Sequence, residues 1–461
     1  MSRALWLVLG ALLCSCAVYR ARPLDPTETE TRYRARTLSD PGLRAYIAAT
    51  RPDRESSAEA DLTDLTLVAF YFHPDLSVAR ARLAAAEAAT VTAGALPNPT
   101  VSVTPEYVFD ARSGLSPWLV TVAIEMPIET AGKRGYRIAR ARHLTEAARL
   151  ELTESAWQVR RRVRDALVEY LLAQDAVKLR AAEEQAQGEV LAILERRLAL
   201  GDVARPVVDA ARGDLAMVRL VARAADGRAA ETRAVLAQTL GVPVAALDGA
   251  AVAWPGFGSL PAAAVDPAAA QRAGLLGRAD IRHALAAYAA TEATLQLEIA
   301  RQYPDVQLSP GYMFDQGANK FAIGLAVTLP LFDQNQGPIA EAEAARLEAR
   351  ARFLAKQAAA IGEIDQARAR YLAAVAELTE AEAARAALEA LEQATARAVA
   401  VGEEDRSALA TVRVRRATSA RIGLEALGRA RSALGALEDA LRQPLDPGVA
   451  LPPLPARAAD R

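Results

Sequence analysis

A hairpin pattern that occurs twice constrains this chain more than any other feature. The first copy lies in residues 98–128 and the second in residues 303–332. Pro304 follows Pro99 by 205 positions and the second strands are 203 positions apart, so only the hairpin loops differ, by two residues. In both copies apolar side chains alternate with small or polar ones, the period of a strand with one apolar face. The sequence therefore predicts two related amphipathic hairpins.

The duplication extends into the segments around the hairpins. Gly201 and Gly402 are 201 positions apart, and each ends a long helical pattern. Each copy therefore reads as helix, strand, strand, long helix, glycine turn and returning helix, which is a tandem repeat. The first long helix, from about Gly132 to Leu200, would span roughly 100 Å at ~1.5 Å per residue. The second, at about 337–401, has a similar length.

Helix lengths predict how each long helix is matched by its neighbours. The returning helices, at about 202–240 and 403–442, are too short to cover the long helices alone. The helices that lead into the hairpins, at about 275–300 and 57–96, have the missing length. We therefore expect two end-on stacks, 202–240 with 275–300 and 403–442 with 57–96.

These patterns divide the chain into segments. The tail is proline-rich, and its composition predicts disorder. The expected segments are a lipoprotein signal peptide (1–15), an extended N-terminal arm (16–56), the first repeat (57–241), an irregular equatorial linker (242–274), the second repeat (275–442) and the C-terminal tail (443–461).

The first residues have the layout of a secretory signal. Arg3 supplies a positive charge, and the following apolar run is too short to span a bilayer as a helix. The run ends in Leu13-Cys14-Ser15-Cys16, which resembles a lipoprotein cleavage box. We interpret Cys16 as a lipidated N-terminus carrying palmitate; the alternative is a plain secretory signal with inert or removed cysteines.

The hairpins have the properties of membrane strands. Each strand has about ten residues, enough to cross a bilayer when tilted, and aromatic side chains lie toward the strand ends. The alternative is a pair of ordinary hairpins in a soluble domain. One chain supplies too few strands to close a barrel, and open edges in lipid leave backbone groups unpaired. A trimer would supply twelve strands, so we expect a mainly α protein whose trimer forms a membrane β-barrel and a long periplasmic α-helical barrel.

Composition and scattered polar residues argue against other function classes. A net charge of −1 offers no basic surface for nucleic acid. His73, His143 and His283 lie far apart in sequence without a second ligand at helical spacing, so we expect no metal site. We find no phosphate-binding loop and no nucleophile with a partnering base, so we expect neither cofactor nor enzyme activity.

Two motifs resemble a known family. Leu329-Pro330-Leu331-Phe332-Asp333-Gln334-Asn335-Gln336-Gly337 is similar to the second-repeat signature of the TolC-like outer-membrane efflux family. Pro127-Ile128-Glu129-Thr130-Ala131-Gly132-Lys133-Arg134 is similar to the CzcC/CusC-like heavy-metal cation branch. The resemblance covers about residues 57–442. It implies an outer-membrane homotrimer of a Gram-negative bacterium, with a lipid-facing barrel, that docks on a periplasmic adaptor and an inner-membrane RND-type pump.

The resemblance also implies site residues at the periplasmic tip, where a glycine-centred turn meets the adaptor. The alternative is that these glycines only reverse the chain. The matching positions are Leu200, Gly201 and Asp202 in the first repeat and Val401, Gly402 and Glu403 in the second.

Acidic residues follow the second tip turn. Glu403, Glu404 and Asp405 would form a negative ring around the axis of a trimer, which attracts cations. Helix capping explains the same residues, since acids complement a helix N-terminus. Some family members place gating aspartates six and nine residues after the glycine, but this chain has Ala408 and Thr411 there.

The sequence thus predicts a passive duct that carries small substrates, heavy-metal cations above all, out of the cell. Two alternatives stay open: a duct for drugs or for type I protein secretion, and a non-conducting periplasmic coiled-coil lipoprotein tether.

Overall fold

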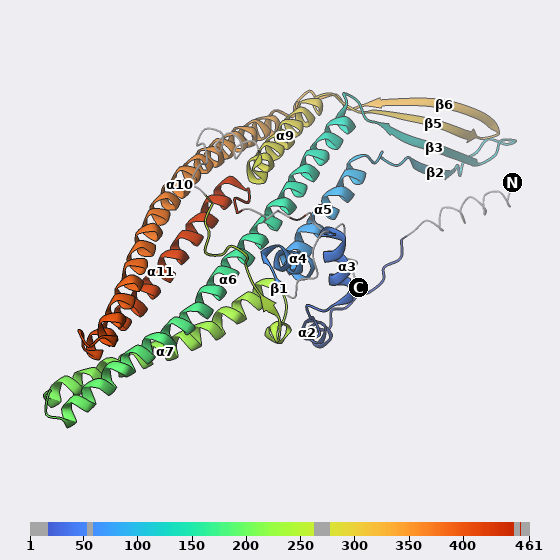
Figure 1. The fold of residues 1–461 in the computed structure, drawn as a ribbon. Coiled ribbons are helices and arrows are strands. Elements are labelled where there is room, and N and C mark those ends of the chain that lie inside the picture. The colour runs from blue at the N-terminus through green and yellow to red at the C-terminus, as the bar shows by residue number, and fades with distance from the viewer. Residues whose placement is uncertain (1–16, 53–58, 262–276, 447–451, 453–461) are drawn as a thin grey trace.

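The computed structural model describes residues 17–52, 59–261, 277–446 and 452. Long antiparallel helices form a rod, and a β-sheet extends from one end of it (Figure 1). The helices are α2 (Pro26–Arg34), α3 (Pro41–Thr50), α4 (Leu62–Phe72), α5 (Pro74–Ala93), α6 (Lys133–Ala199), α7 (Arg205–Leu240), η1 (Val244–Leu247), α9 (Ala279–Ala300), α10 (Gln336–Ala400) and α11 (Arg406–Leu441). The strands are β1 (Glu59–Ala60), β2 (Thr100–Tyr107), β3 (Trp118–Ile128), β4 (Ala251–Val252), β5 (Val306–Asp315) and β6 (Ala318–Val327).

The two long helices confirm the lengths expected from the sequence. α6 has 67 residues and α10 has 65, so each spans about 100 Å. Each begins after a residue in the left-handed region, Gly132 before α6 and Asn335 before α10. Equivalent positions in the two repeats thus turn the chain from strand to helix in the same way.

The end-on stacks exist, but the expected partners are wrong. The C-terminus of α7 meets the start of α5, where Gly241 lies against the backbone of Phe72 and His73. Arg36 donates hydrogen bonds to the carbonyls of both Phe72 and Gly241. In the second repeat, Arg278 before α9 donates to the carbonyl of Ala440 at the end of α11, 2.9 Å away. Each short helix therefore stacks within its own repeat, which needs no crossing between repeats.

The N-terminal arm is not extended as the sequence analysis expected. It contains α2 and α3, each with an aspartate at the N-cap and a proline at the first helical position. Asp25 accepts from the amide of Thr27, and Asp40 accepts from the amide of Leu43. Both signals start a helix, because the cap satisfies a free N–H and proline has none to leave unpaired.

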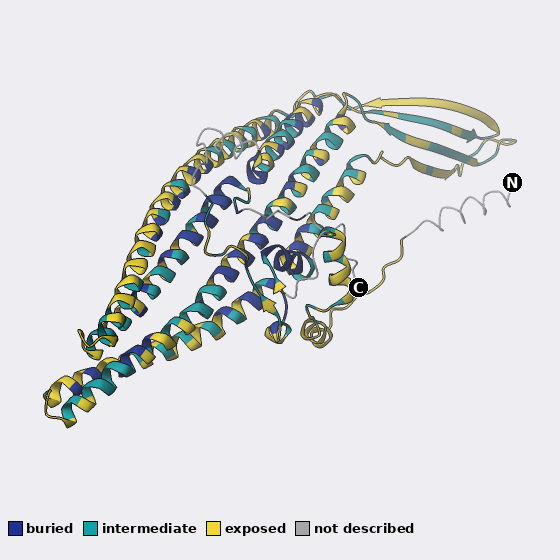
Figure 2. Ribbon diagram, in the orientation of Figure 1, coloured by how far each residue is buried: buried dark blue, intermediate teal, exposed yellow. Residues whose placement is uncertain are grey.

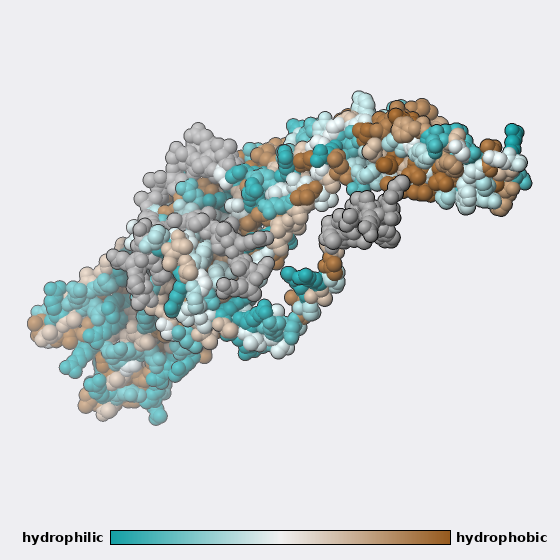
Figure 3. All heavy atoms as spheres, turned by 90° about the vertical axis from the view of Figure 1, so that its right-hand side faces the viewer, coloured by the Kyte–Doolittle hydropathy of each residue, from teal (hydrophilic) through white to brown (hydrophobic). Residues whose placement is uncertain are grey.

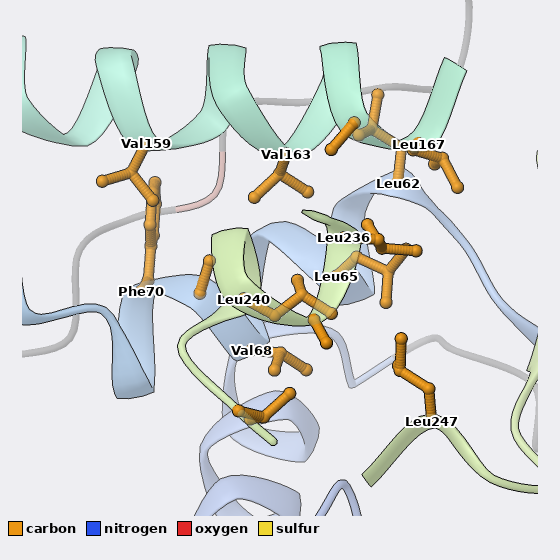
Figure 4. Close-up of a cluster of buried hydrophobic side chains, with 14 of the residues drawn as sticks. Leu62, Leu65, Val68, Phe70, Val159, Val163, Leu167, Leu236, Leu240 and Leu247 are labelled. Carbon is orange, nitrogen blue, oxygen red and sulfur yellow. The ribbon is translucent and has the colours of Figure 1, made fainter. Parts of the chain in front are cut away.

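The apolar core lies where α3 and α4 meet the middle of the rod (Figure 2). α4 inserts between α6 and α7 and is buried along most of its length. Figure 4 shows Leu62, Leu65, Val68 and Phe70 of α4 facing side chains of α6 and α7. Arranged around this cluster are Leu62, Leu65, Val159, Val163, Leu167, Leu236, Leu240 and Leu247.

Buried ion pairs join α6 to α11 beside this core. Arg164 is 4% exposed and donates to Asp439 at 2.8 Å and to Glu438 at 3.2 Å. The indole N–H of Trp157 donates to Asp439, and Arg160 lies over the Trp157 ring. Burial alone would lower the pKa of Arg164, but its hydrogen bond to Asp439 and the neighbouring carboxylates raise it instead. This cluster of buried ion pairs joins the two repeats, because α6 belongs to the first repeat and α11 to the second.

The described part of the linker between the repeats, residues 242–261, is largely irregular, with one 3-10 turn and a strand, β4, that pairs in parallel with β1. Arg431 of α11 holds it, donating to the carbonyls of Gly256 and Ser259 and lying over the Trp254 ring. The same guanidinium pairs with Asp446, the first described acid after α11. The signal peptide, Cys16 and most of the C-terminal tail lie outside the described residues.

Candidate functional site: an apolar sheet and two glycine turns

The four-stranded sheet is antiparallel, with strand order β2-β3-β5-β6. β3 and β5 come from different repeats and pair from Leu119 with Asp315 to Ile128 with Val306. The hairpin strands expected from the alternating pattern are therefore confirmed, and the repeats form one sheet. The outer edges of β2 and β6 have no strand beside them among the described residues.

One face of this sheet is apolar and exposed. Pairing places Val103 opposite Val122, and Leu308 opposite Leu325, so most of the large apolar side chains of the four strands share a face. Figure 3 shows apolar atoms gathered over this end of the molecule. Exposed members include Val101, Val103, Tyr107, Trp118, Ile124, Ile128, Tyr312, Phe321, Ile323, Leu325 and Val327. A contiguous apolar surface of this kind marks contact with another apolar phase or protein.

Aromatic side chains mark the end of the sheet farthest from the helices. Tyr107 packs edge-on against Trp118, with ring centroids 5.0 Å apart, and against Phe109 at 5.2 Å. Tyr312 and Phe321 are paired at the corresponding level of the second hairpin. Amphipathic rings in this position suit the boundary between lipid and water.

The opposite face of the sheet carries mainly small and polar side chains, with Leu119 and Met313 as exceptions. Glu106 and Glu125 point to this face, as do Gly311, Gly324 and Ala326. An ion pair joins Asp315 and Lys320 there. Beyond that neutral pair, Glu106 and Glu125 leave this face negatively charged.

A polar joint fixes the sheet to the helices. Lys133 is 7% exposed, and its Nζ donates to the carbonyl of Tyr303 at 2.6 Å and to Asp305 at 2.7 Å. The amide of Thr130 also donates to Asp305, at 2.9 Å. The motif at residues 127–134 contains Lys133, but the sequence could not supply its partners, which lie 170 residues or more away.

The two glycine turns lie at the opposite end of the rod from the sheet (Figure 1). Gly201 has φ of +80° and Gly402 has φ of +81°, a region that glycine enters without strain. Asp202 donates its amide to the carbonyl of Arg197, and Glu403 does the same to Ala398. Both ends are thus Schellman motifs.

The residues beside these glycines are solvent-exposed. Leu200 is 77% exposed and Val401 is 72% exposed. A side chain added at either glycine would meet nothing within 4 Å. Both turns therefore expose an apolar residue and accessible backbone to solvent.

The acidic residues after the second turn differ in their surroundings. Glu403 and Glu404 are exposed in the turn. Asp405 occupies the N-cap position of α11, accepts from the Ser407 hydroxyl at 2.6 Å and lies 3.5 Å from Arg197. The Ser407 hydrogen bond in particular lowers the pKa of Asp405. Asp405 thus lies at the N-cap position of α11 without a side-chain capping hydrogen bond, and it pairs with Arg197 of the first tip, whereas Glu403 and Glu404 extend into solvent.

Other candidate features are accounted for by structure. His73 is the N-cap of α5, and its Nδ1 accepts from the amide of Asp75. The described part of the chain contains no cluster of three or more histidine, cysteine, aspartate or glutamate residues suited to a metal ion. None of the described helices is long and apolar enough to cross a bilayer.

Together these features define a class: a rod of long antiparallel helices, with a partly apolar β-sheet at one end and two glycine turns at the other. Residues 72–242 match the model of the family described as "Outer membrane efflux protein". This match, over residues 72–242, confirms the resemblance to the outer-membrane efflux family drawn from the two motifs.

A curated relative and several solved structures extend the match. The chain is 29% identical over 272 residues to the cobalt-zinc-cadmium resistance protein CzcC of Cupriavidus metallidurans, covering 57% of this chain and 61% of that protein. The alignment therefore spans less than two thirds of the relative.

Among solved structures, the outer membrane protein VceC of Vibrio cholerae has a TM-score of 0.66 at 22% identity, covering 84% of this chain and 97% of VceC. CusC has a TM-score of 0.66 at 17% identity, covering 83% of this chain and 92% of CusC. These likenesses confirm the expected fold class, mainly helical with strands that belong to a barrel.

Proposed function

We propose that this protein is the outer-membrane duct of a tripartite efflux system and that it works as a homotrimer. The observation that carries the proposal is the sheet, which has an exposed apolar face, an aromatic rim and two open edges. Unpaired backbone groups at a sheet edge cost several kcal/mol each in lipid, so the sheet requires further strands. Three copies would supply twelve strands, an even number that closes a barrel.

The proposed duct passes small ions, and its barrel favours cations. With the apolar face toward lipid, Glu106 and Glu125 face the lumen. Three copies would place six such carboxylates there, and charged rings attract counter-ions in the same way in other pores. Glu403 and Glu404 would add a second negative zone at the tip.

Heavy-metal cations are the proposed substrates. The support is the similarity to a protein named for cobalt, zinc and cadmium resistance, together with the negative lumen. Recognition of the metal belongs to the pump, because a wide aqueous lumen needs no ligand set. Drug efflux and type I secretion are the alternatives that the same architecture permits.

The partners of the duct are proposed from the tip. Leu200, Gly201 and Asp202, with Val401, Gly402 and Glu403, form exposed turns to which a periplasmic adaptor hairpin would bind, linking the duct to an inner-membrane RND-type pump. We further propose, from the sequence alone, that Cys16 carries a lipid anchor in the outer membrane.

The first test is conductance of the purified protein in planar bilayers under a salt gradient. We expect pores with cation preference, and we expect the double variant Glu106→Gln, Glu125→Gln to conduct with a reduced cation-to-anion ratio. A matched control is Glu30→Gln on α2, far from the sheet. Absence of any conductance from a trimer would support the tether alternative instead.

The second test addresses the substrate. A strain lacking the gene should become sensitive to cobalt, zinc or cadmium, and the sensitivity should disappear on complementation. Sensitivity to drugs without any change for metals would move the protein to the drug-efflux alternative.

A further inference from the structure

The two edge strands of the sheet differ from its inner strands in exposure. All residues of β6 and all but one of β2 are exposed, whereas most residues of β3 and β5 are partly covered. Figure 2 shows this contrast along the sheet. Among the described residues, β2 and β6 each lack a neighbouring strand on their outer side. In the proposed trimer, a second copy of this chain supplies that strand.

The chain contains its own template for that joint. β3 ends the first hairpin and β5 begins the second, so the β3·β5 ladder is a contact between two repeats. By the duplication, β6 is equivalent to β3, and β2 is equivalent to β5. The contact between β6 of one copy and β2 of the next is therefore the same kind of joint.

The offsets of the duplication convert this template into residue pairs. Pro330 follows Pro127 by 203 positions, and Tyr312 follows Tyr107 by 205. The observed pair Ala123 with Gly311 then maps onto Ala326 and the partner's Glu106.

We infer that β6 pairs antiparallel with β2 of a neighbouring copy in a single register, with Ala326 opposite the partner's Glu106 and Leu325 opposite the partner's Tyr107. The second pair maps from Val122 with Tyr312. This inference rests on the proposed trimer and adds the register of its subunit joint.

Side-chain chemistry supports this register independently. It also places Val327 opposite the partner's Pro105 and Ile323 opposite the partner's Phe109, so the apolar face continues across the joint without a break. Ala326 and the partner's Glu106 both lie on the polar face. A shift by one residue would turn every apolar side chain of one strand toward the polar face of the other, because the side-chain period is two.

The polar joint below the sheet gives a second, independent support. Thr130 donates its amide to Asp305 within the chain. The equivalent positions across the subunit joint are Asp333 and the partner's Thr100. The same two residue types thus recur with their places exchanged, so a threonine–aspartate contact is available again.

Disulfide trapping in the full-length protein tests the register. The double variant Ala326→Cys, Glu106→Cys should form covalent dimers and trimers on mild oxidation, visible in denaturing gels and lost on reduction. The variant Ala326→Cys, Ser102→Cys moves one cysteine four residues along β2 on the same face. It should stay monomeric, because that displacement is about 13 Å and a disulfide needs Cα atoms within ~7 Å.

Controls separate the register from the trimer. Ala123→Cys, Gly311→Cys reproduces an observed pair within one chain and reports whether oxidant reaches the polar face. Single-cysteine variants give the background. The mass of each purified variant is measured in parallel by light scattering.

The outcomes are distinct. Two results for a protein that is a trimer by mass would overturn the register. In the first, the shifted cysteine pair cross-links as well as the inferred pair. In the second, neither pair cross-links although the internal control disulfide forms. A monomer by mass overturns the proposed function itself.

Discussion

Gly435 of α11 gives a sharp test of the buried charges that join α6 to α11. A Cβ at this position would lie 2.7 Å from Nε, 2.8 Å from Cζ and 2.9 Å from Nη2 of Arg164. Arg164 cannot move aside freely, because its guanidinium is held by Asp439 and Glu438. Gly435→Ala should therefore force a buried guanidinium out of its place.

The expected magnitude combines two opposing effects. Overpacking a buried site costs about 1–3 kcal/mol, and breaking a buried ion pair costs about 3–5 kcal/mol. Replacing glycine by alanine within a helix recovers about 1 kcal/mol. We expect a net loss of about 3 kcal/mol or more for opening this part of α11, which corresponds to roughly 100-fold or greater loss of protection of its amides.

Hydrogen exchange followed by mass spectrometry measures that protection in peptides around Gly435. Gly423→Ala on the same helix is the matched control, since its Cβ would meet nothing within 4 Å and should leave protection equal or slightly higher. In an Arg164→Met background the penalty of Gly435→Ala should shrink, as a double-mutant cycle would show. Unchanged protection in Gly435→Ala alone would refute a fixed guanidinium.

Three further predictions concern stability. Burial above all lowers the pKa of His73, so the folded state binds fewer protons than the unfolded state. The contribution of neutral His73 to folding stability is therefore full above pH ~6.5 and is lost as the pH falls below that value. The variant His73→Asn, which keeps a capping side chain, should show a smaller drop in thermal stability over this pH range. Burial would raise the pKa of Asp280, but Arg278 lowers it to about 2. The stack of α9 on α11 should therefore stay stable down to about pH 4 and weaken between pH 4 and pH 2. Acid titrations followed by circular dichroism would measure this loss. Gly402→Ala should destabilise the second tip by about 1 kcal/mol, because its φ is positive, and Gly402→Asn by less, as exchange of the tip amides would show.

The elements that depend on local sequence could be predicted. The hairpins follow from a two-residue period, and α6 follows from a run without proline, and both were found within a few residues of their bounds. The helices of the arm were missed, because the arm was expected to be extended. Asp25-Pro26 and Asp40-Pro41 are cap-plus-proline starts, so the signal was present in the sequence.

The joints depend on partners far away in sequence and could not be predicted. Lys133 meets Tyr303 and Asp305, and Arg431 meets the linker, through contacts that span more than 160 positions. Nothing in the local pattern distinguishes these cations from the solvated arginines of α7. The tip glycines are the opposite case, since a glycine at a helix end has a local meaning.

Helix lengths alone could not predict which helices stack end on end. α7 and α11 both have 36 residues, and the short helices α5 and α9 have 20 and 22, so either pairing matches the long helices equally well. Contacts at the helix ends decide the matter, through Arg36 in the first repeat and Arg278 in the second.

Stacking within each repeat has a consequence for assembly. Since each repeat closes on itself along its length, the repeats meet sideways, α6 against α9 and α11, and β3 against β5. By the duplication, α10 is the equivalent of α6 and should meet α5 and α7 of the next copy. The burial agrees, because α6 has 17 buried residues whereas α10, of nearly equal length, has only 7. The uncovered face of α10 and the open edge of β6 thus belong to one continuous surface, and the same sideways contact that joins two repeats can join three chains into a closed ring.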